Sequence, residues 1–219
     1  MEEKTGCLKA NIVAASCYGG AAGGWFGTTH HCLEDLALIR VIPNIKIICP
    51  YGERETRLAI DQAINTNSPY YIRLGRNNDY EDFPIQEDHD YYSWYTRGKH
   101  DTVCLISSGE VATDFCIKVT QNISGVSHLH LLNSDLNFLN QKLLLFNSIS
   151  ETIIAVEEHR LLGSLASVLA TLLPNKKVYG YTVDDKWPIY GGSHYEVLDY
   201  LNFSKDSLEA FVKSIKQGG

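Results

Sequence analysis

Three features are absent from this sequence, and each absence excludes a class of protein. No uninterrupted apolar run approaches the roughly 20 residues that a membrane-spanning helix requires, so we expect no transmembrane segment and no membrane partner. No Cys-x-x-Cys pair occurs among the six cysteines, which argues against a zinc cage and a disulfide framework, and we expect reduced, mostly buried thiols. No basic patch is present, because Lys and Arg are spread along a chain of net charge −7, so nucleic acid is not an expected partner.

The residues that are present have the composition of a folded globular protein. Hydrophobic residues make up 44% of the chain and charged residues 21%, and 219 residues suffice for one ordinary domain or two small units. The start of the chain, Met1 to Gly6, is polar and acidic, whereas a secretory signal has a basic start followed by an apolar stretch. We therefore expect the protein in the cytoplasm.

The order of the apolar segments predicts the fold class. From residue 8 onward, short β-branched runs alternate with amphipathic stretches, which is the pattern of an α/β fold whose parallel sheets are covered by helices on both faces. The first 76 residues are predicted to form a β-α-β-α-β unit with a Gly-rich loop over 19–27. Its strands are expected at 12–15, 45–49 and 70–74 and its helices at 33–40 and 53–64.

Residues 77–98 separate this first unit from a second one. The segment is acidic and aromatic and has neither a helical nor a strand period, so we predict an ordered connection that packs its tyrosines, with a recognition surface as the alternative. Residues 99–219 are predicted to be a complete α/β domain that ends in a helix capped by Ser204. Its strands are expected at 103–106, 127–132, 153–156 and 177–181 and its other helices at 110–122, 136–146 and 160–173.

The first unit is incomplete by the same criteria. Three parallel strands and two helices bury little apolar surface, and a strand over 12–15, apolar on both faces, would leave its outer backbone N–H and C=O groups unpaired. We therefore expect another part to cover that edge.

Several motifs in a fixed order resemble those of the transketolase family, which uses thiamine diphosphate. Residues 27–44 resemble the family's G-x-T-H-H-x-x-E-D-x-A-x-x-R-x-x-P-N pattern, and residues 71–76 match its Y-I-R-L-G-R. Residues 156–167, which include Val156-Glu157-Glu158-His159, Gly163 and Ser167, are similar to its V-E-E-H-x-x-x-G-x-x-x-S motif. The resemblance implies that residues 1–76 are a partial pyrimidine-binding (Pyr) domain and residues 99–219 a transketolase C-terminal domain.

The resemblance also implies roles for individual residues. In the family, the histidine at the position of His30 lies beside the cofactor and the substrate and exchanges protons, for which an imidazole is suited. The arginine at the position of Arg76 anchors a sugar phosphate, whereas Arg73 is expected to be structural. Tyr18 stands near the place of a phosphate-binding histidine in the family's S-H-A-G segment and would serve as a neutral donor to the substrate.

Two departures from the family pattern affect these roles. The family's G-E-D-G loop, whose aspartate contacts a sugar hydroxyl, is replaced by Gly24-Trp25-Phe26-Gly27, so we expect an apolar wall or a subunit contact there. The G-D-G metal motif of the diphosphate domain and the cofactor-activating G-I-A-E-Q glutamate do not occur in this sequence. The chain is therefore not expected to be active alone. Thiamine diphosphate and Mg²⁺ would be bound mainly by a separate N-terminal transketolase-like subunit, in a dimer or heterotetramer.

Two classes of function follow from the resemblance. As a subunit of a split transketolase, the chain would help to transfer a two-carbon ketol unit between sugars, expected to be sugar phosphates. A related synthase or 2-oxoacid dehydrogenase subunit would use the same cofactor. The other class is a non-catalytic assembly or regulatory module that stabilises a partner.

Simpler structural roles are open for the same residues. His30 would be a hydrogen-bonded core histidine, and Arg76 would pair with acidic residues at the surface, namely Asp79, Glu81 and Asp82. His31 is expected to cap the following helix.

Two further clusters are expected to be structural. Glu157, Glu158 and His159 lie at a strand end in a domain that the family uses mainly for its architecture. His128 and His130 alternate along a strand and face one side, as metal ligands would, but no Cys or carboxylate follows at a matching spacing, so no metal site is predicted.

Overall fold

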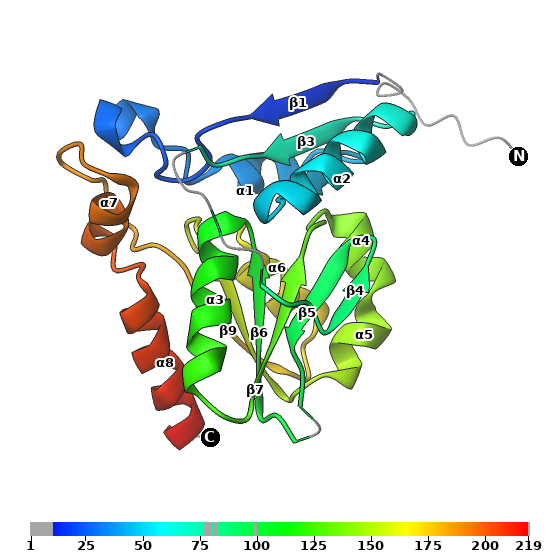
Figure 1. Cartoon of the computed structure of the whole chain (residues 1–219), viewed down its shortest axis with the longest axis vertical. Coiled ribbons are helices and arrows are strands. Elements are labelled where there is room, and N and C mark those ends of the chain that lie inside the picture. Colours follow the sequence, from blue (N-terminus) through cyan, green and yellow to red (C-terminus); the bar gives the residue numbers. More distant parts are fainter. Residues whose placement is uncertain (1–10, 77–79, 81–82, 99, 219) are drawn as a thin grey trace, which may run out of the picture.

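The structure, a computed structural model, describes residues 11–76, 80, 83–98 and 100–218. These residues form two α/β units, each built on its own sheet (Figure 1). The first unit holds a three-stranded parallel sheet in the order β1-β3-β2. Its strands are β1 (Val13–Ser16), β2 (Lys46–Ile48) and β3 (Tyr70–Arg73).

Helices α1 (Asp35–Arg40) and α2 (Gly52–Asn65) cover opposite faces of this sheet. Successive side chains of a strand point to opposite faces, so Tyr71 of β3 packs with Leu36 of α1, while its neighbour Ile72 packs with Ala59 of α2. The α/β fold class predicted from the alternating apolar runs is confirmed.

Strand β1 is the bare border of the first sheet. It pairs in parallel with β3 from Val13 opposite Tyr70 to Ser16 opposite Arg73. Within the described residues no strand pairs with its outer edge. Ile12 and Val13 are 57% and 44% exposed, although the sequence predicts a strand buried on both faces. The strand is thus in place without the layers that would cover it.

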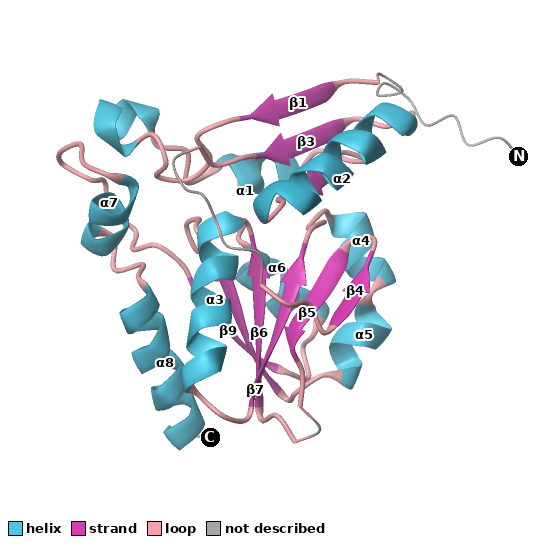
Figure 2. Ribbon diagram, viewed as in Figure 1, coloured by secondary structure: helices cyan, strands magenta, loops and turns pink. Residues whose placement is uncertain are grey.

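The second unit holds a six-stranded sheet in the order β4-β5-β7-β6-β8-β9 (Figure 2). Strands β6 to β9 run parallel to their neighbours, and the hairpin of β4 and β5 adds an antiparallel border to β7. The strands are β4 (Glu87–His89), β5 (Tyr92–Thr96), β6 (Val103–Ser108), β7 (Val126–Leu131), β8 (Thr152–Glu157) and β9 (Lys177–Tyr181).

Helices cover both faces of this second sheet. Helices α3 (Glu110–Asn122) and α8 (Lys205–Gly218) pack on one face, and α4 (Leu136–Gln141), α5 (Leu143–Ser148) and α6 (Leu165–Leu172) pack on the other. A short helix, α7 (His194–Tyr200), precedes α8. The N-cap of α8 is Ser204, as predicted, because its side chain accepts a hydrogen bond from the Ser207 backbone N–H.

The predicted elements differ from the observed ones in four places. Helix 136–146 is divided into α4 and α5 at Lys142, and helix 160–173 begins only at Leu165, capped by Ser164. The sequence analysis predicted neither α7 nor any strand in residues 77–98, where the structure has the β4–β5 hairpin.

The first unit lies over the carboxyl ends of the parallel strands of the second unit (Figure 1). Backbone hydrogen bonds join the two units beside β2, where Cys49 N–H donates to Leu132 O at 2.8 Å and Ser134 N–H to Ile47 O at 2.9 Å. A buried ion pair between Arg40 of α1 and Glu157 of β8 adds to this junction.

Two sequence expectations concern the cysteines and the membrane. Cys49, Cys104 and Cys116 are buried, Cys17 is exposed, Cys32 is partly buried, and these five thiols are free, whereas Cys7 lies outside the described residues. None of the helices in the described ranges is both long and apolar enough to cross a membrane.

Candidate functional site

Two predicted substrate residues meet where β1 and β3 end. Tyr18 follows β1 and Arg76 follows β3, and because the strands are parallel their carboxyl ends lie at the same border of the sheet. The guanidinium carbon of Arg76 lies 4.8 Å from the centre of the Tyr18 ring, within the range of a cation–π contact. Tyr18 has a φ of +63°, a left-handed conformation that is unusual for a bulky side chain and often marks a functional loop.

A pair of short 3₁₀ helices extends this contact to the predicted catalytic histidine. Phe26 ends η1 (Gly24–Phe26), and His30 ends η2 (Thr28–His30). The Phe26 ring lies 6.3 Å from the Tyr18 ring and 5.0 Å from the imidazole of His30, centre to centre. Thr29 Oγ1 lies 3.1 Å from His30 Nδ1. We call the continuous set Arg76, Tyr18, Phe26 and His30 the aromatic row.

The aromatic row faces outward. Phe26 is 59% exposed, and His30 and Arg76 are also exposed. The position of His30 contradicts the alternative of a buried core histidine. The acidic residues that were the alternative partners of Arg76, namely Asp79, Glu81 and Asp82, lie outside the described residues. The structure thus brings together His30, Tyr18 and Arg76, whose roles in catalysis and substrate binding stay predictions.

Arg73 is buried beneath the aromatic row and is structural, as expected. Its Nε donates to Asp35 Oδ2 at 2.9 Å, and one terminal nitrogen donates to the carbonyl oxygens of Cys32 and Glu158, both at 3.0 Å. The same guanidinium therefore ties α1, the Gly-rich loop and the second unit together.

The Glu157-Glu158-His159 run occupies the junction between the units. The Glu157 carboxylate receives the guanidinium of Arg40, and His159 Nε2 accepts a hydrogen bond from the Ala37 backbone N–H at 3.2 Å. Glu158 Oε1 accepts from the Ala21 backbone N–H at 2.6 Å. The expectation of a structural role agrees with these contacts, but Glu158 also supports the loop that carries the aromatic row.

His31 does not cap the following helix, so that prediction is wrong. Helix α1 begins at Asp35 with Glu34 as its N-cap residue, and His31 is too far from the helix start to serve. Its ring nitrogens are buried without a hydrogen-bond partner among the described residues. Burial lowers the pKa of His31, so the neutral form is favoured there.

The pair His128 and His130 lies inside the second unit. His128 Nε2 lies 2.8 Å from Ser107 Oγ, and His130 Nε2 lies 2.8 Å from Glu55 Oε2 of α2. Burial lowers the pKa of His128 well below its ordinary value. In the part of the chain that the structure describes, no group of three or more His, Cys, Asp or Glu residues is placed to hold a metal ion.

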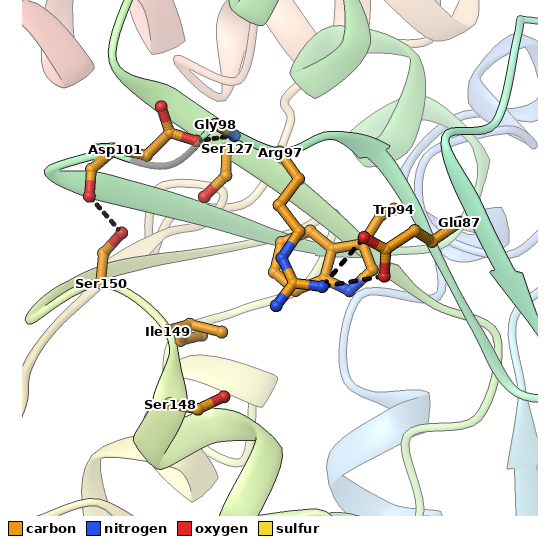
Figure 3. Close-up of a pocket in the computed structure, with 9 residues that line it drawn as sticks. All are labelled: Glu87, Trp94, Arg97, Gly98, Asp101, Ser127, Ser148, Ile149 and Ser150. Atoms are coloured by element: carbon orange, nitrogen blue, oxygen red, sulfur yellow. Dashed lines mark hydrogen bonds and ion pairs between the residues drawn. The ribbon is translucent and has the colours of Figure 1, made fainter.

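A separate hollow of about 540 Å³ lies near the amino ends of the second unit's parallel strands (Figure 3). Its cation, Arg97, is paired with Glu87 at 2.8 Å and lies over the Trp94 ring at 4.7 Å. The charge of Arg97 is therefore already balanced by its neighbours, and we place the candidate site at the aromatic row.

Residues 7–80 match the family model of the transketolase pyrimidine-binding domain. One of the two subunits of apulose-4-phosphate transketolase from Actinobacillus succinogenes is 29% identical over 178 residues, which are 74% of this chain and 53% of that protein. The 1-deoxy-D-xylulose-5-phosphate synthase of Halothermothrix orenii is 31% identical over 168 residues, which are 72% of this chain and 25% of the synthase.

Among solved structures, a split-gene transketolase described as an inactive β4 tetramer superposes with a TM-score of 0.74 and 22% identity. The superposition covers 93% of this chain and 65% of the other. The chain thus spans about half the length of the first relative and about two thirds of the split-gene chain.

Proposed function

Because residues 7–80 belong to the transketolase pyrimidine-binding domains and the whole chain resembles the C-terminal section of transketolases, we propose that it is the C-terminal subunit of a split, thiamine-diphosphate-dependent transketolase-like enzyme. When it is assembled with a separate N-terminal subunit, the complex transfers a two-carbon ketol unit between sugars. Sugar phosphates are the proposed substrates.

The observation that carries this proposal is the aromatic row. One exposed surface holds an imidazole that exchanges a proton near neutral pH, aromatic faces that exclude water, and a guanidinium that receives an anion. In the proposed complex, His30 handles protons on the substrate, and Arg76 with Tyr18 binds the phosphate end. The chain of contacts from His30 to Arg76 makes one substrate able to reach both.

The residues fit one part of the cofactor and not the other. When bound, thiamine diphosphate supplies the thiazolium carbon that accepts and passes on the two-carbon unit. The exposed Phe26 ring beside His30 offers a flat surface suited to a heteroaromatic ring. The described residues contain no cluster for a metal ion, so we assign Mg²⁺ and the diphosphate to the partner chain.

The bare border at β1 supports the proposed partner. Strands of a parallel sheet are buried on both faces, yet Ile12 and Val13 remain largely exposed. A second copy that paired through its own β1 would fill the edge but leave both faces uncovered. The occupant must therefore bring a strand and covering helices, which suits an N-terminal section better than another copy. The relative solved as an inactive β4 tetramer supports the proposal that this chain is inactive alone.

Reconstitution tests the proposal. The purified chain is mixed with an N-terminal transketolase-like polypeptide, thiamine diphosphate and Mg²⁺, and ketol transfer between sugar phosphates is measured after the complex is isolated. We expect cofactor-dependent transfer, and we expect His30→Ala to lower turnover by about 100-fold or more. His89→Ala, on the exposed strand β4, is the matched control. An isolated complex without turnover would favour the non-catalytic assembly module.

A related synthase subunit is the second candidate function, favoured by the 31% identity to a 1-deoxy-D-xylulose-5-phosphate synthase. Its reaction would consume a 2-oxoacid with loss of carbon dioxide. Supplying pyruvate to the same complex separates the two candidates, because a transketolase leaves pyruvate untouched.

A further inference from the structure

A cluster of buried ionisable side chains lies beneath the aromatic row. Glu158 at the end of β8, His194 of α7, Glu110 of α3 and Arg73 of β3 line a cavity of about 20 Å³. Glu158 and His194 are only 6% and 4% exposed. Four elements from both units thus bring their charges to one point, and neither His194 nor Glu110 was expected from the sequence.

Glu158 holds the turn from which the aromatic row begins. Its Oε1 accepts the Ala21 backbone N–H at 2.6 Å. Gly20 has a φ of +69°, and a Cβ atom at this position would overlap the Glu158 carboxylate. The carboxylate therefore lies directly against the backbone between Tyr18 and Phe26, where only glycine leaves room for it.

His194 holds Glu158 in this position. Its Nε2 lies 2.8 Å from the same Oε1 atom that accepts the Ala21 N–H. The start of α7 is also fixed, because Ser193 and Glu196 form a capping box. Just before α7, the Gly192 N–H donates to Gly24 O at 3.0 Å. The α7 segment thus contacts the loop both through Glu158 and directly.

We propose that the Glu158–His194 pair is a latch by which the C-terminal unit positions the loop of residues 18–30, and with it Tyr18, Phe26 and His30. Glu158 and His194 are positioning residues, because they act through the Ala21 backbone and do not touch the aromatic row. That the loop serves a substrate rests on the proposed function, whereas the latch itself does not.

The latch should respond to pH, because both partners titrate. Burial alone would lower the pKa of His194, but the adjacent Glu158 carboxylate outweighs burial and raises it. Burial alone would raise the pKa of Glu158, but His194 and Arg73 outweigh burial and lower it. The pair is therefore fully charged between the ordinary values of about 4.5 and 6.5, and it is lost as the pH rises through the raised pKa of His194.

Other groups that face the pair are Glu110, Arg73, His31 and Tyr195. Burial raises the pKa of Glu110 to about 6, so its carboxyl group titrates in the same pH range. The test must therefore separate His194 from Glu110.

Hydrogen exchange at single backbone amides tests the latch in the chain alone. His194→Gln removes the titratable charge and keeps a side chain of similar reach. At pH 6 we expect the Ala21 amide to exchange roughly tenfold faster or more in this variant, since a charge-assisted network is lost. The amide of Val212 in α8 should keep its wild-type rate. Glu158→Gln should have the same local effect, and the exposed Glu151→Gln is the control.

The pH profile distinguishes a latch from a merely structural contact. After correction for the intrinsic rise in exchange with pH, protection of Ala21 should fall between pH 6 and 9 in the wild type and in Glu110→Gln, and stay flat in His194→Gln. Unchanged Ala21 protection in His194→Gln would overturn the proposal. So would a pH dependence that persists in His194→Gln and disappears in Glu110→Gln. Because no assay of activity is involved, failure here leaves the proposed ketol transfer untouched, and the reverse also holds.

Discussion

Replacing Arg40 by methionine tests how strongly the two units are clamped. The Arg40 guanidinium makes two contacts with the Glu157 carboxylate, at 2.5 and 3.1 Å, and donates to Gly163 O at 2.8 Å. The two side chains are 5% and 1% exposed. Without Arg40, the carboxylate would stay buried with the Leu165 N–H, at 2.8 Å, as its remaining hydrogen-bond donor among the described residues.

The magnitude follows from this burial. Removing one partner of a buried ion pair costs about 3–5 kcal/mol, because the remaining charge is left uncompensated. Whole proteins have free energies of unfolding of only about 5–15 kcal/mol, so Arg40→Met should be strongly destabilising. The matched control is Arg57→Met, which breaks an exposed pair with Glu53 and should cost less than about 1 kcal/mol.

The pH dependence gives an independent check. Burial alone would raise the pKa of Glu157, but Arg40 outweighs burial and lowers it. In the wild type, this pair stabilises the fold above the ordinary Glu pKa, and the contribution is lost as the pH falls through the lowered value. Without Arg40, burial raises the pKa of Glu157, so stability is lost as the pH rises. The destabilisation by Arg40→Met should therefore be larger at pH 8 than at pH 5.

Urea unfolding followed by tryptophan fluorescence at pH 5 and pH 8 measures both effects. The double variant Arg40→Met with Glu157→Gln should recover a large part of the loss, because the buried charge is then gone. A cost below about 1 kcal/mol at pH 8, or no recovery in the double variant, would refute the reasoning about the clamp.

Three further substitutions have expected outcomes. Gly163→Ala places a methyl group against Ala37 at a φ of +74° and should cost about 1–3 kcal/mol in urea unfolding; a neutral result would contradict the close contact. Ser193→Ala removes the cap of α7 and should cost about 1 kcal/mol, with faster amide exchange in α7 than in α8. Arg76→Met should raise KM for phosphorylated sugars in the reconstituted complex, and an equal rise for unphosphorylated sugars would argue against phosphate binding.

The sequence predicted the elements whose pattern is local. Strands β6, β7 and β8 are continuous apolar runs buried on both faces, and the apolar period of α3 marks its bounds at 110 and 122. Strand β4, by contrast, is three exposed polar residues, Glu87 to His89, and its partner β5 is fixed by pairing with β7. Such pairing is a long-range contact that a local period does not record.

The candidate site was predictable to a similar extent. His30, Tyr18 and Arg76 were proposed from motifs that resemble a family, and the parallel pairing of β1 with β3 then explains why Tyr18 and Arg76 meet. The Glu158–His194 pair was missed because its residues are 36 positions apart and meet only through the packing of α7. The role of His31 was wrong because the start of α1, and with it the cap, lies at Glu34.

The open border at β1 has a consequence for how the chain must be produced. Unpaired strand edges act as templates on which further strands add, and an apolar strand favours that addition. Copies made in excess of the completing polypeptide would therefore be the first to aggregate. Balanced synthesis of the two polypeptides would then matter as much for keeping this one in solution as for any chemistry at its loops.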